Sequence, residues 1–171
     1  MGIERAESAA MSAPKHVLFV CTGNTCRSPL AEGLFRQATV GRTDFTVSSA
    51  GIAATKGTPA SRETQHILKQ RGAPLTGFKS RPVTATILQA ATHVFAMTTG
   101  HIAALETRFP EHAAKLFLVR EFAGMTDKRH GTDVPDPIGM GIAAYEEVAK
   151  LLDAAIPSII AYIDQTPNPQ G

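Results

Sequence analysis

The stretch VLFVCTGNTCRSP, residues 17–29, determines the fold that we expect. Residues 17–20 form a short, continuous apolar run rich in β-branched and aromatic side chains, which is typical of a strand buried on both faces of a sheet. From Ser28 to Ala38 apolar residues recur at helical spacing, and Pro29 lies in the first turn, where its missing N–H costs nothing. The stretch therefore predicts a strand at the centre of a sheet, a tight loop and a helix.

The rest of the chain alternates between strand-like and helix-like segments. Strands are expected at residues 45–49, 92–97 and 116–119, and helices at residues 62–71, 101–108 and 143–163. This alternation predicts an α/β fold, a three-layer sandwich in which a central, mainly parallel four-stranded sheet carries helices on both faces. Pro157 is expected to kink or split the last helix. A ligand of such a sheet binds at the carboxyl ends of the strands, so the loop after Val20 is the first place to look for a site.

The composition indicates one globular domain. The chain has 171 residues, of which 43% are apolar and 19% are charged, so it can bury one hydrophobic core. We expect this domain at residues 15–165, between a flexible N-terminal extension (1–14) and a flexible tail (166–171). No feature of the sequence indicates an oligomeric state.

Charge and hydropathy exclude two classes of partner. The formal net charge of +2 is too small for a nucleic-acid-binding surface, although a local basic site is compatible with it. No apolar run is long enough for a membrane span, and the N-terminal stretch lacks the apolar core of an export signal. The two cysteines are closely spaced and favour reactive chemistry in a reducing compartment, so a cytoplasmic protein is expected.

The loop after the first strand combines a nucleophile with features that bind an anion. A chain that turns sharply through Gly23 and Asn24 can point several backbone N–H groups inward, and the following helix adds its positive end, so phosphate is the expected ligand. The same field favours the thiolate form of Cys21, which makes this cysteine the predicted nucleophile, accessible to solvent. Arg27 offers a planar fork for two phosphate oxygens at once. Ser28 can donate its hydroxyl to the Cys21 sulfur or cap the helix, and we favour the former.

A phosphatase that uses Cys21 also needs an acid. Attack on phosphorus leaves a phosphocysteine, and the departing group takes a proton from a nearby carboxylic acid. Asp136 is the predicted acid because Pro135 and Pro137 hold it in a loop that cannot easily become helix or central strand. Asp133 in the same loop is the alternative.

No metal and no cofactor are expected. The histidines show no ligand spacing and no pairing with cysteine, so each is assigned a surface or packing role. They are His16, His66, His93, His101, His112 and His130.

Four short motifs connect the chain with a known family: VLFVCTGNTCRSP (17–29), SAG (49–51), AMT (96–98) and DPIG (136–139), the last followed by Tyr145. On these motifs most of the chain resembles the low molecular weight protein tyrosine phosphatase family, including its bacterial protein-arginine-phosphatase branch. The resemblance implies that Cys21 is the nucleophile, that Arg27 binds phosphate, and that Asp136 donates the proton and later activates the hydrolytic water. It also implies that Asn24 braces the loop through side-chain hydrogen bonds.

The expected partner is a phosphorylated protein or peptide, with phosphate as product or inhibitor. The residues expected to bind the phosphorylated group are Thr22, Gly23, Asn24, Thr25, Cys26 and Ser28.

Two features bear on which phosphorylated residue is the substrate. Family members that act on phosphotyrosine usually carry Ile at position 25, whereas the arginine-phosphatase branch carries Thr, and this chain has Thr25. The aromatic residues that hold a phosphotyrosine ring in tyrosine-specific relatives are missing, because Ile138 stands in DPIG and Ile52, Ala53 and Ala54 follow SAG. Loss of such stacking, worth about 0.5 to 1.5 kcal/mol per pair, should weaken phosphotyrosine binding roughly tenfold. We therefore favour phosphoarginine, although the arginine branch usually has Phe in place of Ile138.

Two other functions are compatible with the same loop. Arsenate reductases share the fold and the cysteine loop, but they need a relay of further cysteines, and none follows Cys26. A non-catalytic phosphate-binding module would be expected to lack the nucleophile or the acid, whereas this chain retains Cys21, Arg27 and Asp136. Cys26 itself is either a small side chain in the loop wall or the partner of Cys21 in a reversible disulfide that shields the nucleophile from over-oxidation.

Overall fold

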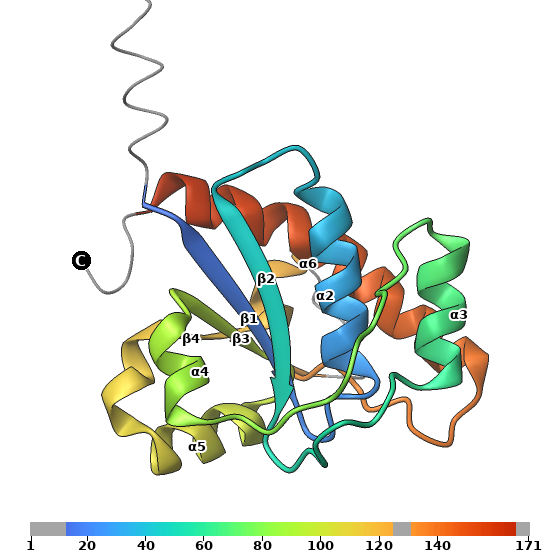
Figure 1. Cartoon of the computed structure of the whole chain (residues 1–171), viewed down its shortest axis with the longest axis horizontal. Coiled ribbons are helices and arrows are strands. Elements are labelled where there is room, and N and C mark those ends of the chain that lie inside the picture. The colour runs from blue at the N-terminus through green and yellow to red at the C-terminus, as the bar shows by residue number, and fades with distance from the viewer. Residues whose placement is uncertain (1–12, 125–130, 167–171) are drawn as a thin grey trace, which may run out of the picture.

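The computed structural model describes residues 13–124 and 131–166. They form a four-stranded parallel sheet with strand order β2-β1-β3-β4 (Figure 1). The strands are β1 (Lys15–Cys21), β2 (Phe45–Gly51), β3 (His93–Ala96) and β4 (Leu116–Leu118). The predicted fold class is confirmed, and β1 has a neighbour on each side, as expected for a central strand.

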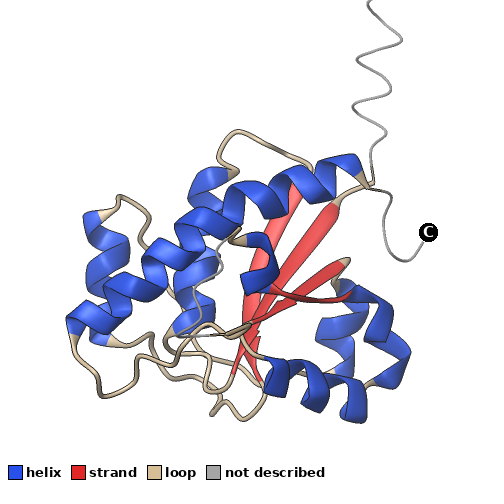
Figure 2. Cartoon of the chain, turned by 180° about the vertical axis from the view of Figure 1, so that it is seen from behind, coloured by secondary structure: helices blue, strands red, loops and turns tan. Residues whose placement is uncertain are grey.

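Helices cover both faces of the sheet. One face carries α2 (Arg27–Ala38), α3 (Arg62–Gln70) and α6 (Ile142–Gln165), and the other carries α4 (Ala85–Ala90) and α5 (Thr99–Arg108) (Figure 1). Seen from behind, the long helix α6 crosses the strands (Figure 2). Two 3-10 helices, η1 (Pro110–Lys115) and η2 (Val119–Phe122), flank β4. Among the described helices, none is both long and apolar enough to cross a membrane.

The side chains of β1 divide the interior into two hydrophobic cores. Val17 and Phe19 pack in the core under α2 and α6, while Leu18 and Val20 pack in the core under α4 and α5. All four side chains are fully buried, because both faces of the sheet are covered and successive residues of a strand point to opposite faces. This burial explains why the strand is apolar at every position instead of at alternate ones.

Of the two outcomes predicted at Pro157, a kink or a split, the split is wrong, since α6 continues through this residue. Pro157 lacks the N–H that would bond to the carbonyl of Asp153, and both residues lie on the exposed side of the helix, where water can satisfy that carbonyl. The buried stripe on the other side, which includes Leu152, Ile156 and Ile159, packs without interruption. The helix therefore keeps its packing and loses only one solvent-facing hydrogen bond.

The remaining differences concern short elements and the chain ends. The sequence did not predict α4 or the two 3-10 helices, and α2 begins at Arg27, one residue earlier than expected. The extension predicted for residues 1–14 and the tail predicted for residues 166–171 lie mostly outside the described residues, which exclude 1–12 and 167–171. His130 also lies outside the described residues.

Candidate active site

The loop Cys21–Ser28, which we call the cysteine loop, lies at the carboxyl ends of the parallel strands. It begins at the last residue of β1 and continues into α2. The chain after β2 runs beside it, where the backbone N–H of Ile52 donates to the Cys21 carbonyl at 2.9 Å. A Cβ atom on Gly51 would lie 2.5 Å from the carbonyl oxygen of Thr22, so the close approach of these segments requires glycine. The site is thus where the sheet topology predicts a ligand.

Ser28 contacts the sulfur of the predicted nucleophile. Its Oγ atom lies 2.9 Å from Cys21 Sγ. The same oxygen accepts a hydrogen bond from Asn24 Nδ2 at 2.8 Å, so the Ser28 hydroxyl proton is free to point at the sulfur. No side chain caps the N-terminus of α2, and of the two roles open to Ser28 the structure places its hydroxyl at the sulfur. A hydroxyl donor at this position stabilises a thiolate.

Asn24 holds the cysteine loop in shape. Among the described residues other than glycine, only Asn24 has a positive φ, at 56°, in the left-handed region. Its Nδ2 also donates to Ser49 Oγ at 2.9 Å, and its Oδ1 accepts the backbone N–H of Arg81 at 2.9 Å. Because that N–H can only donate, it fixes the orientation of the Asn24 amide. The side-chain hydrogen bonds implied by the family resemblance are present.

A buried carboxylate extends this network, and the sequence analysis missed it. Ser49 Oγ donates to Glu32 Oε1 at 2.7 Å, and Arg36 Nη2 lies 3.1 Å from Glu32 Oε2. Glu32 is 7% exposed, so its two donors offset the cost of burying its charge. The available signal was an acidic residue within the apolar helical pattern of residues 28–38. Glu32 thus anchors Ser49 and, through it, Asn24.

Arg27 joins the cysteine loop to the loop that precedes α6. Its guanidinium is buried and donates from Nη1 to the carbonyl of Val134 at 3.0 Å. Its Nη2 lies 3.7 Å from Asp136 Oδ2 and 3.5 Å from Thr22 Oγ1. The structure therefore brings Arg27 and the predicted acid together across more than a hundred residues of sequence.

Asp136 and Asp133 have different environments. The Asp136 side chain is 49% exposed and faces the cysteine loop, with its Oδ1 accepting the backbone N–H of Ile138 at 3.1 Å. Asp133 Oδ1 instead accepts the backbone N–H of Thr99 at 2.7 Å, at the start of α5. Asp133 is thus engaged with a helix N-terminus, which favours Asp136 as the acid.

His101 is a second residue that the sequence analysis misjudged. Its Nε2 lies 2.8 Å from Thr22 Oγ1, so it contacts the cysteine loop and is more than a packing residue. It is 7% exposed, and burial, followed by the nearby Arg27 cation, lowers the pKa of His101 to about 4. His101 is therefore neutral at pH 7. The available signal was its position in the first turn after the AMT motif.

Cys26 packs against the last helix. Its sulfur lies 3.3 Å from the hydroxyl of Tyr145, and burial raises the pKa of that hydroxyl to about 12. Cys21 and Cys26 are both free thiols in the structure. Tyr145, the residue that follows DPIG in the family motif, thus supports the wall of the cysteine loop.

A small pocket of about 120 Å³ lies within this arrangement. At about 30 Å³ per water molecule it holds roughly four waters, enough for a phosphoryl group but not for a whole substrate side chain. Cys21 is only 2% exposed, deeper than the accessible nucleophile that we expected, yet it lines this pocket. The lining residues are Cys21, Thr22, Gly23, Thr25, Cys26, Arg27, Asp136 and Ile138.

Two of the residues predicted to bind substrate do not line the pocket. Asn24 and Ser28 are fully buried, and they act on the loop and on the Cys21 sulfur.

Within residues 13–124 and 131–166 no group of three or more histidine, cysteine, aspartate or glutamate side chains is arranged to hold a metal ion.

The structure places a cysteine and an arginine in one loop between a strand and a helix, facing a carboxylate from a distant loop. On a parallel α/β sheet this is the arrangement expected of a cysteine-dependent phosphatase. The family model described as low molecular weight phosphotyrosine protein phosphatase matches residues 16–168. The chain belongs to this family and is a phosphatase.

Similar proteins act on two kinds of phosphorylated residue. The chain is 37% identical over 143 residues to a protein-arginine-phosphatase of Geobacillus stearothermophilus, covering 84% of this chain and 92% of the relative. It is 35% identical over 162 residues to low molecular weight protein-tyrosine phosphatase A of Mycobacterium tuberculosis, covering 91% of this chain and 95% of the relative.

Solved structures share the fold. A low molecular weight protein tyrosine phosphatase from T. tengcongensis superposes with a TM-score of 0.79 at 37% identity, covering 86% of this chain and 99% of that one. A cysteine-to-serine mutant of an arginine phosphatase, with its active-site serine phosphorylated, superposes with a TM-score of 0.80 at 28% identity. That alignment covers 90% of this chain and 99% of the mutant.

Proposed function

We propose that this phosphatase hydrolyses phosphorylated protein side chains through a phosphocysteine intermediate on Cys21. The observation that carries the proposal is the convergence of Cys21, Arg27 and Asp136 on a pocket the size of a phosphoryl group. The related arginine phosphatase with a phosphorylated active-site serine supports it, because there a phosphoryl group is bonded to the residue that replaces the active-site cysteine.

In the first step the Cys21 thiolate attacks phosphorus. A sulfur–phosphorus bond forms while the bond from phosphorus to the leaving oxygen or nitrogen breaks, and the protonated Asp136 gives its proton to that leaving atom. Arg27 holds two non-bridging oxygens and the charge that gathers on them. The Ser28 hydroxyl stabilises the thiolate before attack.

In the second step water hydrolyses the intermediate. Asp136, now a carboxylate, takes a proton from the attacking water, the sulfur–phosphorus bond breaks, and Cys21 leaves as a thiolate with inorganic phosphate as product. In the ligand-free structure Asp136 lies near Arg27, so a bound phosphoryl group shares Arg27 with this carboxylate. Phosphate is therefore expected to inhibit competitively.

Substitutions of the three residues test this mechanism. Cys21→Ser is expected to abolish release of phosphate from a small aryl phosphate, and retained turnover would refute the assignment of the nucleophile. Asp136→Asn is expected to slow formation of the phosphocysteine most for poor leaving groups. Asp133→Asn is the matched control, because the same chemical change is made in the same loop at a carboxylate bonded to Thr99. Equal effects of the two changes would remove Asp136 from the mechanism.

Phosphoarginine is the substrate that we propose for this site. Thr25 lines the pocket and offers a hydroxyl to a polar guanidinium, as in the arginine-phosphatase branch. None of the described residues that line the pocket is aromatic, and the exposed Ile138 at its edge stands where tyrosine-specific relatives carry an aromatic residue. The identities do not separate the two substrates, because relatives named for arginine and for tyrosine are both 37% identical to this chain, so the choice rests on the pocket wall.

The deciding experiment compares two peptides of one sequence that carry phosphoarginine or phosphotyrosine at the same position. The ratio of their kcat/KM values is expected to favour phosphoarginine, and Thr25→Ile is expected to shift this ratio toward phosphotyrosine. A wild-type preference for phosphotyrosine, or a ratio that Thr25→Ile leaves unchanged, would overturn the assignment of phosphoarginine while leaving the phosphocysteine mechanism intact.

We also propose that the protein acts in the cytoplasm. The mechanism requires a reduced Cys21, and a reducing compartment maintains it. The free state of both cysteines in the structure is compatible with this location.

A further inference from the structure

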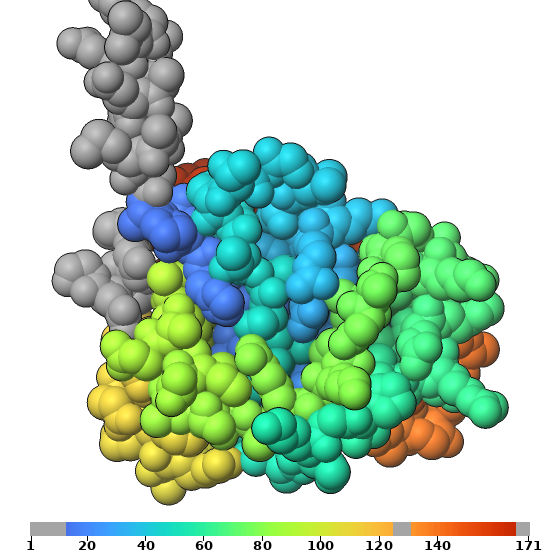
Figure 3. All heavy atoms as spheres, in the orientation of Figure 1, coloured from blue at the N-terminus to red at the C-terminus, as the bar shows by residue number. Residues whose placement is uncertain are grey.

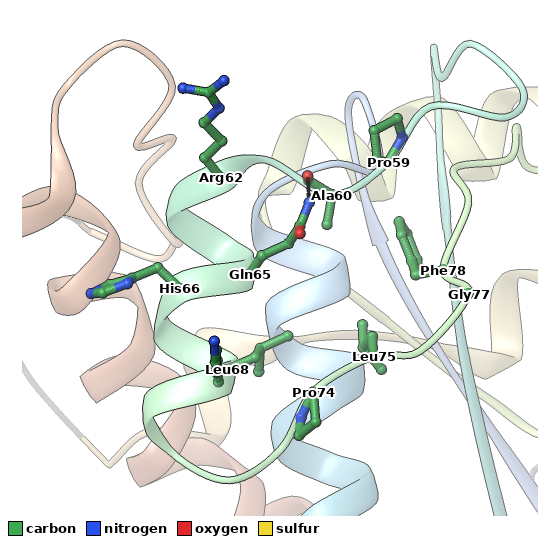
Figure 4. A pocket seen from close by; sticks show the side chains of 11 residues that line it. Pro59, Ala60, Arg62, Gln65, His66, Leu68, Pro74, Leu75, Gly77 and Phe78 are labelled. Carbon is green, nitrogen blue, oxygen red and sulfur yellow. Dashed lines mark hydrogen bonds between the residues drawn. The ribbon is translucent and has the colours of Figure 1, made fainter.

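A large cavity lies outside the catalytic pocket, between α3 and the segment at residues 74–78. It measures about 570 Å³, and we call it the α3 groove. Leu68 points from α3 into it, toward Leu75 on the opposite wall, whereas the Gln65 side chain points toward Ala60 and its Nε2 donates to the Ala60 carbonyl at 2.6 Å (Figure 4). Phe78 lies on the same wall as Leu75. In the space-filling view, residues 60–80 form one side of an exposed face of the molecule (Figure 3). The α3 groove is therefore an apolar site that is open to a ligand from solution.

The α3 groove begins next to the cysteine loop. The backbone N–H of Ser61, the residue before α3, donates to the Thr25 carbonyl at 2.8 Å. One turn later Thr64 Oγ1 donates to the Cys26 carbonyl at 3.2 Å. The N-terminus of α3 is thus bonded to the wall of the catalytic pocket. Because that pocket holds little more than the phosphoryl group, the rest of a polypeptide substrate must lie on the surface around it.

Unpaired positive charge surrounds the α3 groove. Arg62 and Lys69 are among its lining residues, none of which is acidic, and Lys79 follows Phe78 in sequence. Within the described part of the chain, no carboxylate pairs with any of these three cations. Arg62 extends outward at the end of α3 nearest Ser61 (Figure 4). An apolar floor with free cations at its edge favours a ligand that is both apolar and anionic.

We propose that the α3 groove binds the segment of the phosphoprotein substrate that flanks the phosphorylated residue, through one apolar side chain and neighbouring acidic residues. This inference rests on the proposed function. From Ser61 to Lys69 the helix rises about 12 Å, which an extended peptide covers in about four residues. The preferred substrate therefore carries a large apolar residue and acidic residues in a stretch of about four residues close to the phosphorylated one.

Peptides of matched design test this proposal. One has a leucine and two glutamates on one side of the phosphorylated residue, a second has them on the other side, and a third has only glycine and serine. Their KM values are measured with the wild type and with two groove variants, Gln65→Trp, which fills the cavity, and Lys69→Glu, which reverses its charge. Lys150→Glu on α6 is the matched charge control, and thermal unfolding checks that each variant is folded.

The expected result is a KM about tenfold lower for one flanked peptide than for the glycine–serine peptide, as when one leucine-sized side chain is partly buried. Both groove variants should remove this preference, while turnover of a small aryl phosphate stays within twofold and Lys150→Glu behaves as wild type. Equal KM values for all peptides, or loss of the preference in the control as well, would overturn the inference. So would a Gln65→Trp protein that changes only in self-association by sedimentation, because the groove would then be an interface between copies of the chain. Absence of aryl phosphate turnover in the wild type would instead overturn the proposed function.

Discussion

Replacement of Gly51 by alanine tests how closely the cysteine loop depends on the end of β2. An alanine Cβ would lie 2.5 Å from the Thr22 carbonyl oxygen and 3.0 Å from the Asn24 backbone nitrogen. Ordinary contact begins at 3.4 Å, so the two backbone segments must separate by about 0.9 Å. Neither neighbour is the flexible end of a side chain, and the cysteine loop must therefore move.

The expected losses of stability and of catalytic activity both follow from this displacement. Overpacking of this kind lowers the free energy of unfolding by about 1 to 3 kcal/mol. For a chain of this length the melting temperature falls by about 2 to 4 °C per kcal/mol, so a drop of roughly 2 to 12 °C is expected. A displacement near 1 Å at catalytic groups costs about a hundredfold in rate, so kcat on an aryl phosphate should fall by about two orders of magnitude. Activity should thus be lost in a protein that remains folded at 25 °C.

The assay pairs thermal unfolding with steady-state kinetics on an aryl phosphate. Gly100→Ala is the matched control, because its new Cβ would lie no closer than 3.5 Å to another residue and alanine favours the helix there. Gly51→Ala with kcat within threefold of wild type would show that the loop does not depend on this contact. A kcat loss of equal size in Gly100→Ala would refute the reasoning as well.

Three further predictions concern histidines and one surface ion pair. Burial lowers the pKa of His93 to about 4, so the unfolded state takes up a proton first and stability should fall as the pH drops from about 6.5 to 4. His93→Phe should flatten this fall in thermal melts at pH 7 and pH 5, and an unchanged slope would contradict the assignment. Hydrogen bonding to Arg42 lowers the pKa of Asp44 to about 2. The ion pair therefore stabilises the folded state above about pH 4, and this stabilisation is lost as the pH falls toward 2. Asp44→Asn should reduce the loss of stability that is measured when the folded protein is titrated with acid. A steeper loss in that variant would count against the ion pair. His101→Phe removes the hydrogen bond to Thr22 and should raise KM for an aryl phosphate about fivefold to tenfold. His101→Asn, which can still bond to Thr22, should have a KM between those of His101→Phe and the wild type. Equal KM values for the two variants would make His101 a packing residue only.

The strands and the longer helices were predictable because their hydrophobic patterns are local in the sequence. Residues 17–20 read as a buried central strand because β1 has helices over both of its faces. The helix is not split at Pro157, one of the two outcomes expected there, because the rule for proline considers the helix alone. In the folded chain the carbonyl of Asp153 lies on the exposed side, and the opposite stripe packs in the core. Helix α4 was missed because six residues are too few to show a period.

In the site, too, the residues that are close in sequence were predictable, and most of those that meet only in the folded chain were not. Cys21, Arg27 and Ser28 are close in sequence, and their arrangement follows from a strand, a turn and a helix. Glu32 and His101 reach the cysteine loop only through the tertiary fold, Glu32 by way of Ser49 and His101 by way of Thr22. Asp136 is equally distant in sequence, but the prolines around it and the DPIG motif mark it as a candidate. The signals at Glu32 and His101 are weaker, because they show an unusual position and do not identify Ser49 or Thr22 as the partner.

The geometry separates the chemical step from the choice of substrate. The groups proposed for bond making and proton transfer, Cys21, Arg27 and Asp136, line the pocket proposed for the phosphoryl group, which is the same in every substrate. The leaving group meets different residues, because Thr25 stands at the pocket wall and the side chain of Ile138 is 60% exposed beside it. A change at the wall therefore alters how well one leaving group binds relative to another, while a change at Cys21, Arg27 or Asp136 lowers turnover of all of them. Thr25→Ile should accordingly act through the ratio of two substrates and leave aryl phosphate kcat within about threefold, because it changes a side chain of the pocket wall and none of the groups proposed for bond making or proton transfer.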